Sequence, residues 1–234
     1  MLSCNSALLA IASEFTGTYS PYQSVELTPH ERGGVFLAST DKGNVACLAF
    51  DPAGEGDETI NLLPNTELIK ASRGVKTATR TLVIEDDIAK VTTYRKTTSE
   101  TKEIPINRSS VNSPNLAKAL KDCLDHWDRL DAQSVSATAG RYNISYIQRA
   151  IKGLSTLNAS VILSSFNGGP MRIEESSGDI VVLVMPQTAE PIPPIPQWLR
   201  NYAHEGTTPQ ICLLYTSDAA DEGLGVDLGG RRII

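Results

Sequence analysis

The sequence has few of the residues from which metal centres and active sites are built. It contains three histidines and four cysteines in 234 residues. His30, His126 and His204 are scattered and lack the short spacing of metal ligands. No phosphate-binding glycine pattern, GxSxG turn or nucleophile–base pair can be recognised. The sequence therefore predicts a protein that is not an enzyme and that needs no cofactor or metal.

Long hydrophobic runs are also missing. No stretch approaches the roughly 20 apolar residues that span a bilayer, and the N-terminal segment lacks the basic start and cleavage site of a signal peptide. Cys4, Cys47 and Cys123 lie far apart in apolar surroundings, which is typical of buried free thiols in a reducing compartment. The formal charge of −6 excludes a uniformly basic nucleic-acid coat but permits a local basic surface.

The C-terminal segment, residues 212–234, does not resemble natural protein sequence. It reads CLLYTSDAADEGLGVDLGGRRII, and its two ends back-translate in one frame into the arms of a transposon-based sequencing adapter. The codons between them leave room for a short index. We therefore expect this segment to be an adapter-derived artefact, and we expect that the natural protein can continue past Ile211.

The hydrophobic pattern alternates between period 2 and helical spacing. Leu8, Leu9, Ala12 and Phe15 predict an amphipathic helix near the N-terminus. Further helices are predicted at residues 63–74, at 116–127, and from 143 with a buried face of Ile147, Ala150, Ile151 and Leu154. Strands are predicted at residues 24–28, 34–40, 44–50, 60–62, 80–84, 88–94, 134–139, 160–165, 170–174 and 179–185.

A Ser/Asn/Pro-rich stretch divides the chain. Residues 106–115 are the best linker candidate, and the segments on either side share one order of helix, strands, helix and strands. This weak internal repeat predicts an α+β fold with two domains, at residues 1–105 and 116–190. The Pro-rich residues 191–211 are predicted to form an extended tail that does not pack as sheet.

Four segments carry recognisable motifs. A strand ending in Ser-Thr-Asp occurs in GGVFLASTDKGNVACLAF (residues 33–50), and a Met-Pro pair closes GPMRIEESSGDIVVLVMP (169–186). Between them lie LVIEDDIAKV (82–91) and RYNISYIQRAIKGL (141–154). In order and spacing, these segments resemble the bacterial and phage β sliding clamps, which are DNA polymerase processivity factors. The resemblance covers roughly residues 8–187.

The resemblance implies sliding-clamp (processivity-fold) domains with antiparallel sheets outside and helices inside. It also implies a ring without enzymatic activity that tethers a replicative DNA polymerase to double-stranded DNA in the cytoplasm. Bacterial clamps have three such domains per subunit, whereas two can be placed here. A reduced, phage-encoded clamp would close its ring as a homotrimer in the host cytoplasm, and a truncated gene is the alternative.

The implied DNA-facing surface lies on helices. Lys70 and Arg73 have i, i+3 spacing on one helix, as do Arg149 and Lys152 on another. The predicted DNA-facing residues are Lys70, Arg73, Lys76, Arg80, Lys118, Lys121, Arg149 and Lys152. A solvated helix face is the alternative for each of them, notably at 116–127, where acidic residues share the lysines' face.

The implied partner pocket lies near the last strand. By the resemblance, Val184, Met185 and Pro186 would bind short peptide motifs of the DNA polymerase and the clamp loader. Sheet core is the alternative role for Val184, and strand termination for Pro186. The alternative function for the whole chain is a non-ring α+β module for protein interaction.

Overall fold

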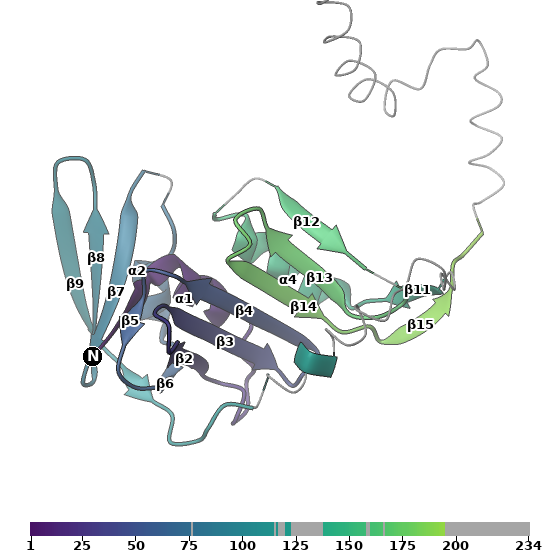
Figure 1. Cartoon of the computed structure of the whole chain (residues 1–234), viewed down its shortest axis with the longest axis horizontal. Coiled ribbons are helices and arrows are strands. Elements are labelled where there is room, and N and C mark those ends of the chain that lie inside the picture. Colours follow the sequence, from purple (N-terminus) through teal and green to yellow (C-terminus); the bar gives the residue numbers. More distant parts are fainter. Residues whose placement is uncertain are drawn as a thin grey trace, which may run out of the picture. The chain divides into compact units, whose positions relative to one another are not determined.

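The computed structural model describes residues 1–75, 77–114, 116, 120–122, 138–157, 160–165 and 167–194 (Figure 1). The chain divides into two compact units, Met1–Ile192 and Pro193–Ile234. Only Pro193 and Pro194 of the second unit are described, so the fold below is that of the first. Most of the predicted helix at 116–127, and the segment predicted to be adapter-derived, lie outside the described residues.

One order of elements occurs three times: a strand, a helix and three strands. The first repeat consists of β1 (Leu2–Asn5), α1 (Ser6–Ser13), β2 (Val25–Pro29), β3 (Val35–Asp41) and β4 (Val45–Asp51). The second consists of β6 (Ile60–Leu63), α2 (Thr66–Ser72), β7 (Thr79–Glu85), β8 (Ile88–Tyr94) and β9 (Ser99–Pro105). The third consists of β11 (Thr138–Arg141), α4 (Ile144–Leu154), β12 (Val161–Ser164), β13 (Met171–Glu175) and β14 (Ile180–Val184). The short strands are β5 (Glu55–Gly56), β10 (Asn107–Arg108) and β15 (Thr188–Pro191).

The first two repeats exchange strands. β1 pairs with β7 of the second repeat, and β6 pairs with β2 of the first. The sheets have the orders β5-β1-β7-β8-β9 and β10-β6-β2-β3-β4-β14-β13-β12, with β11-β15 as a separate pair. All of these pairings are antiparallel, so the predicted α+β class with antiparallel sheets is confirmed.

The eight-stranded sheet joins the third repeat to the first. β14 lies beside β4, with Val182 opposite Cys47 and Val184 opposite Val45. This sheet therefore continues from the N-terminal strands into the C-terminal strands, although more than a hundred residues separate them in sequence.

The helix predicted near the N-terminus is present as α1, but its predicted amphipathic character was wrong. Residues 2–5 form β1, and all eight residues of α1 are buried. Asn5 begins the helix, since its side chain accepts a hydrogen bond from the Ala7 N–H. The helix packs against α2 and against strands of both large sheets, so no side is left for water.

The two described cysteines are buried, as predicted. Cys4 and Cys47 carry free thiols. Burial raises the pKa of each thiol to about 12, and the charge of Asp51 adds to the shift at Cys4. Both residues are therefore inert core side chains at neutral pH.

Three local predictions were imperfect. The predicted buried face of α4 holds for Ala150 and Leu154, but Ile151 is 43% exposed because the helix packs along a narrower stripe. The linker prediction covered β10, whose backbone extends the sheet beside β6. Pro191 was expected outside any sheet but ends β15 at an edge, where its missing N–H is tolerated.

Candidate functional site

A groove runs across the outer face of the eight-stranded sheet. Successive side chains of a strand point to opposite faces. Leu27, Leu37 and Cys47 point inward and are fully buried. The alternating positions on the same strands therefore point outward, away from the core.

The register of the sheet aligns these outward positions in one row. Glu26 lies opposite Ala38, and Ala38 opposite Leu48. Leu48 in turn lies opposite Val181, and Val181 opposite Glu174. The row thus has three apolar side chains in the middle and a carboxylate at each end.

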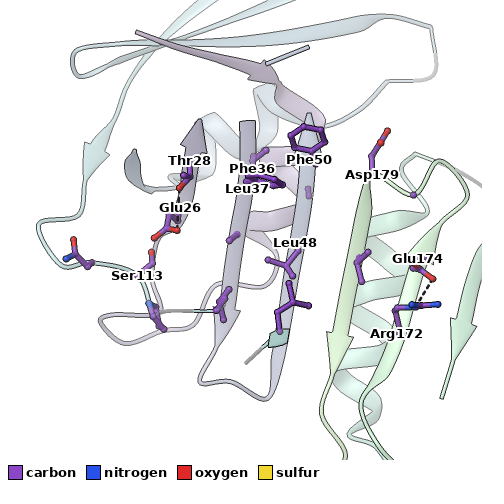
Figure 2. A pocket seen from close by; sticks show the side chains of 18 residues that line it. Glu26, Thr28, Phe36, Leu37, Leu48, Phe50, Ser113, Arg172, Glu174 and Asp179 are labelled. Atoms are coloured by element: carbon purple, nitrogen blue, oxygen red, sulfur yellow. Dashed lines mark hydrogen bonds and ion pairs between the residues drawn. The ribbon is translucent and has the colours of Figure 1, made fainter. Parts of the chain in front are cut away.

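A second row lies beside the first. Thr28 is paired with Phe36 and Phe36 with Phe50, whose N–H donates to the Asp179 carbonyl at 2.9 Å. The two phenyl rings lie 4.7 Å apart between centroids, and the His30 ring meets Phe36 edge-on at 5.2 Å. Together the two rows form the floor of a cavity of about 820 Å³ (Figure 2), a size typical of ligand sites.

The segment after β10 forms one wall of the groove. The Ser109 N–H donates to the Asn61 carbonyl at 2.7 Å, and the Ser113 hydroxyl donates to Asn61 Oδ1 at 2.8 Å. Ser113 Oγ also lies 3.1 Å from Ser24 Oγ. These contacts hold the predicted linker against β2 and β6, so that Asn112, Ser113 and Pro114 line the cavity.

The three residues predicted to form the partner pocket fall beside this groove. Val184 is fully buried, which matches the alternative role in the sheet core. Met185 is 38% exposed and lines a smaller cavity of about 50 Å³ that shares Leu48, Leu116 and Leu120 with the groove. Pro186 is half-buried just after the end of β14.

Sequence reasoning missed the floor of the groove. Its members come from β2, β3, β4, β13 and β14, and only the β4–β14 pairing brings them together. The available signal was the outward-facing apolar residues Phe36, Leu48 and Phe50 on strands whose other face is already apolar. A sheet that is apolar on both faces indicates that both faces are covered.

Four of the predicted DNA-facing cations are exposed. Lys70 lies in the last turn of α2, and Lys152 in the last turn of α4. Arg73 follows α2, and its Nη2 lies 3.5 Å from Glu14 Oε1. Lys121 is also exposed. A cation in the last turn of a helix interacts favourably with the helix dipole, so local stability alone accounts for Lys70 and Lys152.

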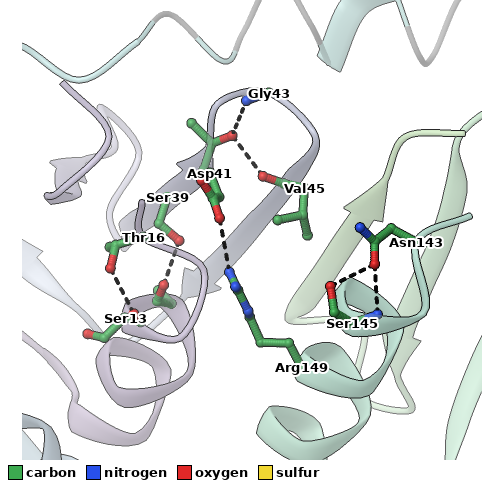
Figure 3. Close-up of polar contacts among 11 residues, drawn as sticks. Ser13, Thr16, Ser39, Asp41, Gly43, Val45, Asn143, Ser145 and Arg149 are labelled. Carbon is green, nitrogen blue, oxygen red and sulfur yellow. Dashed lines mark hydrogen bonds and ion pairs between the residues drawn. The ribbon is translucent and has the colours of Figure 1, made fainter. Parts of the chain in front are cut away.

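Besides Arg73, two predicted cations are engaged within the protein and are less exposed. The Arg80 guanidinium donates to the Ala71 and Arg73 carbonyls, each at 2.7 Å, and so satisfies the C-terminal end of α2. Arg149 Nη1 lies 3.4 Å from Asp41 Oδ2 (Figure 3). Lys76 and Lys118 lie outside the described residues.

The C-terminal ends of α2 and α4 lie next to each other. A Cβ placed on Gly74, just after α2, would be 3.5 Å from Leu157 Cδ2, just after α4. A Cβ on Gly153 would be 3.6 Å from Ile11 Cγ2 of α1. The exposed cations of α2 and α4 therefore belong to neighbouring helix ends.

The groove and the helices α1 and α4 lie on opposite faces of the eight-stranded sheet, whereas α2 packs against α1 and against β8 and β9 of the other large sheet. Leu154 of α4 packs in one core with the inward-facing Val182 and Ile173, whereas Val181 and Glu174 line the groove. Within the part of the chain that the structure describes, no cluster of His, Cys, Asp or Glu could hold a metal ion. No described helix is long and apolar enough to cross a membrane.

No protein-family model and no curated protein matches this sequence. Solved structures match its fold. A protein from Eubacterium rectale described as a DNA polymerase III beta subunit aligns with a TM-score of 0.51 and 11% identity, covering 80% of this chain and 65% of the other. The DNA polymerase III beta subunit of Thermotoga maritima aligns with a TM-score of 0.50 and 10% identity, covering 86% and 67%. The DNA polymerase III beta subunit of Borrelia burgdorferi aligns with a TM-score of 0.50 and 12% identity, covering 80% of this chain and 64% of the other.

The chain therefore has the fold of the DNA polymerase III beta subunits, and the predicted structural resemblance to the sliding clamps is confirmed. It spans about two-thirds of the length of these structures.

Proposed function

We propose that the chain is a subunit of a DNA sliding clamp, a protein without enzymatic activity that tethers a DNA polymerase to double-stranded DNA. The observation that carries the proposal is a sheet with two differently equipped faces. A peptide-sized groove lies on one face, and α4 with its exposed Lys152 lies on the other, beside the C-terminal end of α2. A processivity factor needs such an arrangement, because it holds DNA and a partner at the same time.

The DNA-facing surface is proposed to be formed by the helix ends. Lys70, Arg73 and Lys152 are exposed at these ends and can contact phosphates. Lys121 is also exposed, but it follows Leu120, which lines the groove, so it is not part of these helix ends. Contacts to phosphates carry no base readout, so binding is independent of sequence and the protein can move along the duplex. The remaining predicted cations are Lys76, Arg80, Lys118 and Arg149, of which Arg80 and Arg149 act through their charge because their guanidinium groups already have partners.

The groove is proposed to receive short linear motifs of the polymerase and the clamp loader. Leu48, Phe36 and Phe50 give it an apolar floor, and the pinned segment at 109–114 gives it a wall. Met185 extends the apolar surface at one side, and a methionine suits a surface that accepts several partners.

The proposed assembly is a homotrimeric ring. Light scattering on the chain is expected to give about three times the 25.2 kDa subunit mass. The decisive assay compares retention on nicked circular DNA with retention after the circle is linearised, in the presence of a loader. A clamp stays on the circle and slides off the linear molecule. Equal retention on both forms, with a monomeric mass, would favour the non-ring interaction module.

A further inference from the structure

Glu26 is a charged group at one end of the apolar row, without a basic partner. Among the residues that the structure describes, no Lys, Arg or His side chain lies within ion-pair distance of it. The carboxylate at the other end differs, because Glu174 Oε2 lies 2.9 Å from Arg172 Nε. The groove thus has one neutralised end and one acidic end.

The surroundings of Glu26 leave its charge uncompensated. Its cross-strand neighbours are Ala38 and Asn61, and Ser113 stands in the wall beside it. Partial burial raises the pKa of Glu26, and a weak hydrogen bond from the Thr28 hydroxyl, at 3.5 Å, opposes the shift only in part. An incoming cation interacts more strongly with a half-buried carboxylate that has no cationic partner than with a carboxylate in open water.

We propose that the groove selects partner segments that place a Lys or Arg side chain on Glu26 and apolar side chains over Leu48 and the two phenyl rings. This inference rests on the proposed peptide-docking function of the groove and adds a specificity determinant to it. Acidic or phosphorylated segments are disfavoured, since Glu26 and Asp179 line the cavity and would repel them.

The sheet geometry fixes where the basic residue must lie in such a segment. Glu26 and Leu48 are two strands apart, which corresponds to about 10 Å at the usual strand spacing. An extended peptide that crosses the strands covers this distance in about three residues. The selected motif therefore has its basic residue about three positions from its main apolar anchor.

The test selects peptides from a random library with the full-length chain and with its Glu26→Gln variant. The wild-type protein is expected to enrich peptides with Lys or Arg about three positions from Leu, Ile or Phe. The Glu26→Gln protein is expected to enrich the apolar residues alone. Glu100→Gln is the matched control, because Glu100 is an exposed carboxylate on β9, far in sequence and on the other large sheet.

A synthetic copy of the most enriched peptide then measures how much the basic residue contributes to binding affinity. Replacing its basic residue by Gln is expected to weaken binding to the wild-type protein about tenfold, as for loss of one charge-assisted hydrogen bond. The same replacement is expected to change binding to Glu26→Gln by less than about twofold. Equal losses with both proteins, or selected peptides without a basic preference, overturn the inference and leave the docking groove intact.

A groove variant separates this outcome from failure of the docking function itself. Leu48→Arg places a large cation on the groove floor, at an outward-facing position, and is expected to abolish enrichment. Circular dichroism and thermal unfolding verify that this variant is folded. If the wild-type protein enriches no peptide, or if folded Leu48→Arg enriches the same peptides, the groove is not a docking site and both proposals fail.

Discussion

At the scale of single residues, the ionisation of Glu26 makes the stability of the protein depend on pH. A raised carboxyl pKa means that folding favours the protonated form. The contribution of the protonated Glu26 carboxyl to folding stability is fully present below its unfolded-state pKa. It is lost as pH rises through its folded-state pKa. The ionised form at neutral pH therefore disfavours the free protein and favours a cationic partner.

We predict that the Glu26→Gln variant gains stability relative to the wild type as pH rises. Glutamine resembles the protonated carboxyl, so the two proteins converge in acid. They diverge as pH rises from the unfolded-state pKa of Glu26 to its raised folded-state pKa, and the difference is constant above it. The other charged groups of the groove, Arg172, Glu174 and Asp179, are common to both proteins. Urea unfolding at several pH values measures the difference, and a constant difference across the series would contradict the prediction.

The Arg149–Asp41 ion pair joins the third repeat to the first. Arg149 lies on α4, and Asp41 ends β3. Arg149 also lies 5.4 Å from the centre of the Tyr146 ring, which orients the guanidinium. The side chains are 31% and 18% exposed, so this pair is less screened than an open surface ion pair.

We predict a coupling energy of about 1 kcal/mol between these two side chains. The measurement is a double-mutant cycle with Arg149→Met and Asp41→Asn, followed by urea unfolding. Asp41→Asn alone leaves an unpaired Arg149 side chain that can turn to water. The two single variants are therefore expected to lose different amounts of stability. Additive effects of the two substitutions would show that the pair contributes nothing to stability.

At the scale of secondary-structure elements, α1 is a core element. Its apolar residues and its two serines are all buried, and the serines find acceptors within the protein. Ser6 Oγ donates to the Ser72 carbonyl, and Ser13 Oγ donates to the Leu9 carbonyl. Each buried hydroxyl is thereby satisfied without water, which explains how a helix with polar residues can be enclosed.

We predict that Leu9→Ala destabilises the protein by about 3 kcal/mol, within the range for a fully enclosed leucine. Leu9 is 0% exposed, whereas Ile151 of α4 is 43% exposed. Ile151→Ala is therefore the control and is expected to cost less than about 1 kcal/mol. Thermal and urea unfolding compare the two variants, and equal losses would show that α1 is not enclosed as described.

At the scale of the whole molecule, the two faces of the long sheet are proposed to serve two kinds of recognition. On the inner face α4 carries the exposed Lys152, and the outer face carries an apolar groove with one acidic end. The net charge of −6 belongs to the whole chain, so the proposed DNA association would depend on the local arrangement of cations. Such binding is expected to weaken strongly with salt.

We predict that Lys70→Gln and Lys152→Gln each reduce the salt dependence of DNA binding. Each phosphate contact contributes a slope of about −0.9 to a plot of log affinity against log salt concentration for duplex DNA. Fluorescence anisotropy with a labelled duplex measures the slope for each variant. Lys96→Gln, an exposed lysine between β8 and β9, is the matched control. Equal slopes for all three variants would place the DNA elsewhere.

The hydrophobic pattern by itself determined most of the elements. Alternation in residues 34–50 defined the β3–β4 hairpin, and Lys42 and Gly43 have the positive φ that its tight turn requires. The helical spacing in α4 and the motifs along the chain were sufficient for the fold class and the sliding-clamp resemblance. These features depend on neighbours in sequence, which a pattern can reveal.

Only the tertiary structure decided which strands meet. The β4–β14 pairing creates the row from Glu26 to Glu174, and it joins segments whose sequences give no register. The N-terminal segment has the sequence pattern of an amphipathic helix, but it forms a strand and a fully buried helix because both sheets enclose it. Arg80 donates a hydrogen bond to the Ala71 carbonyl at the end of α2, a contact that the sequence pattern did not indicate. In each case the reason is the same: burial and partner choice depend on residues distant in sequence, and local periodicity does not encode them.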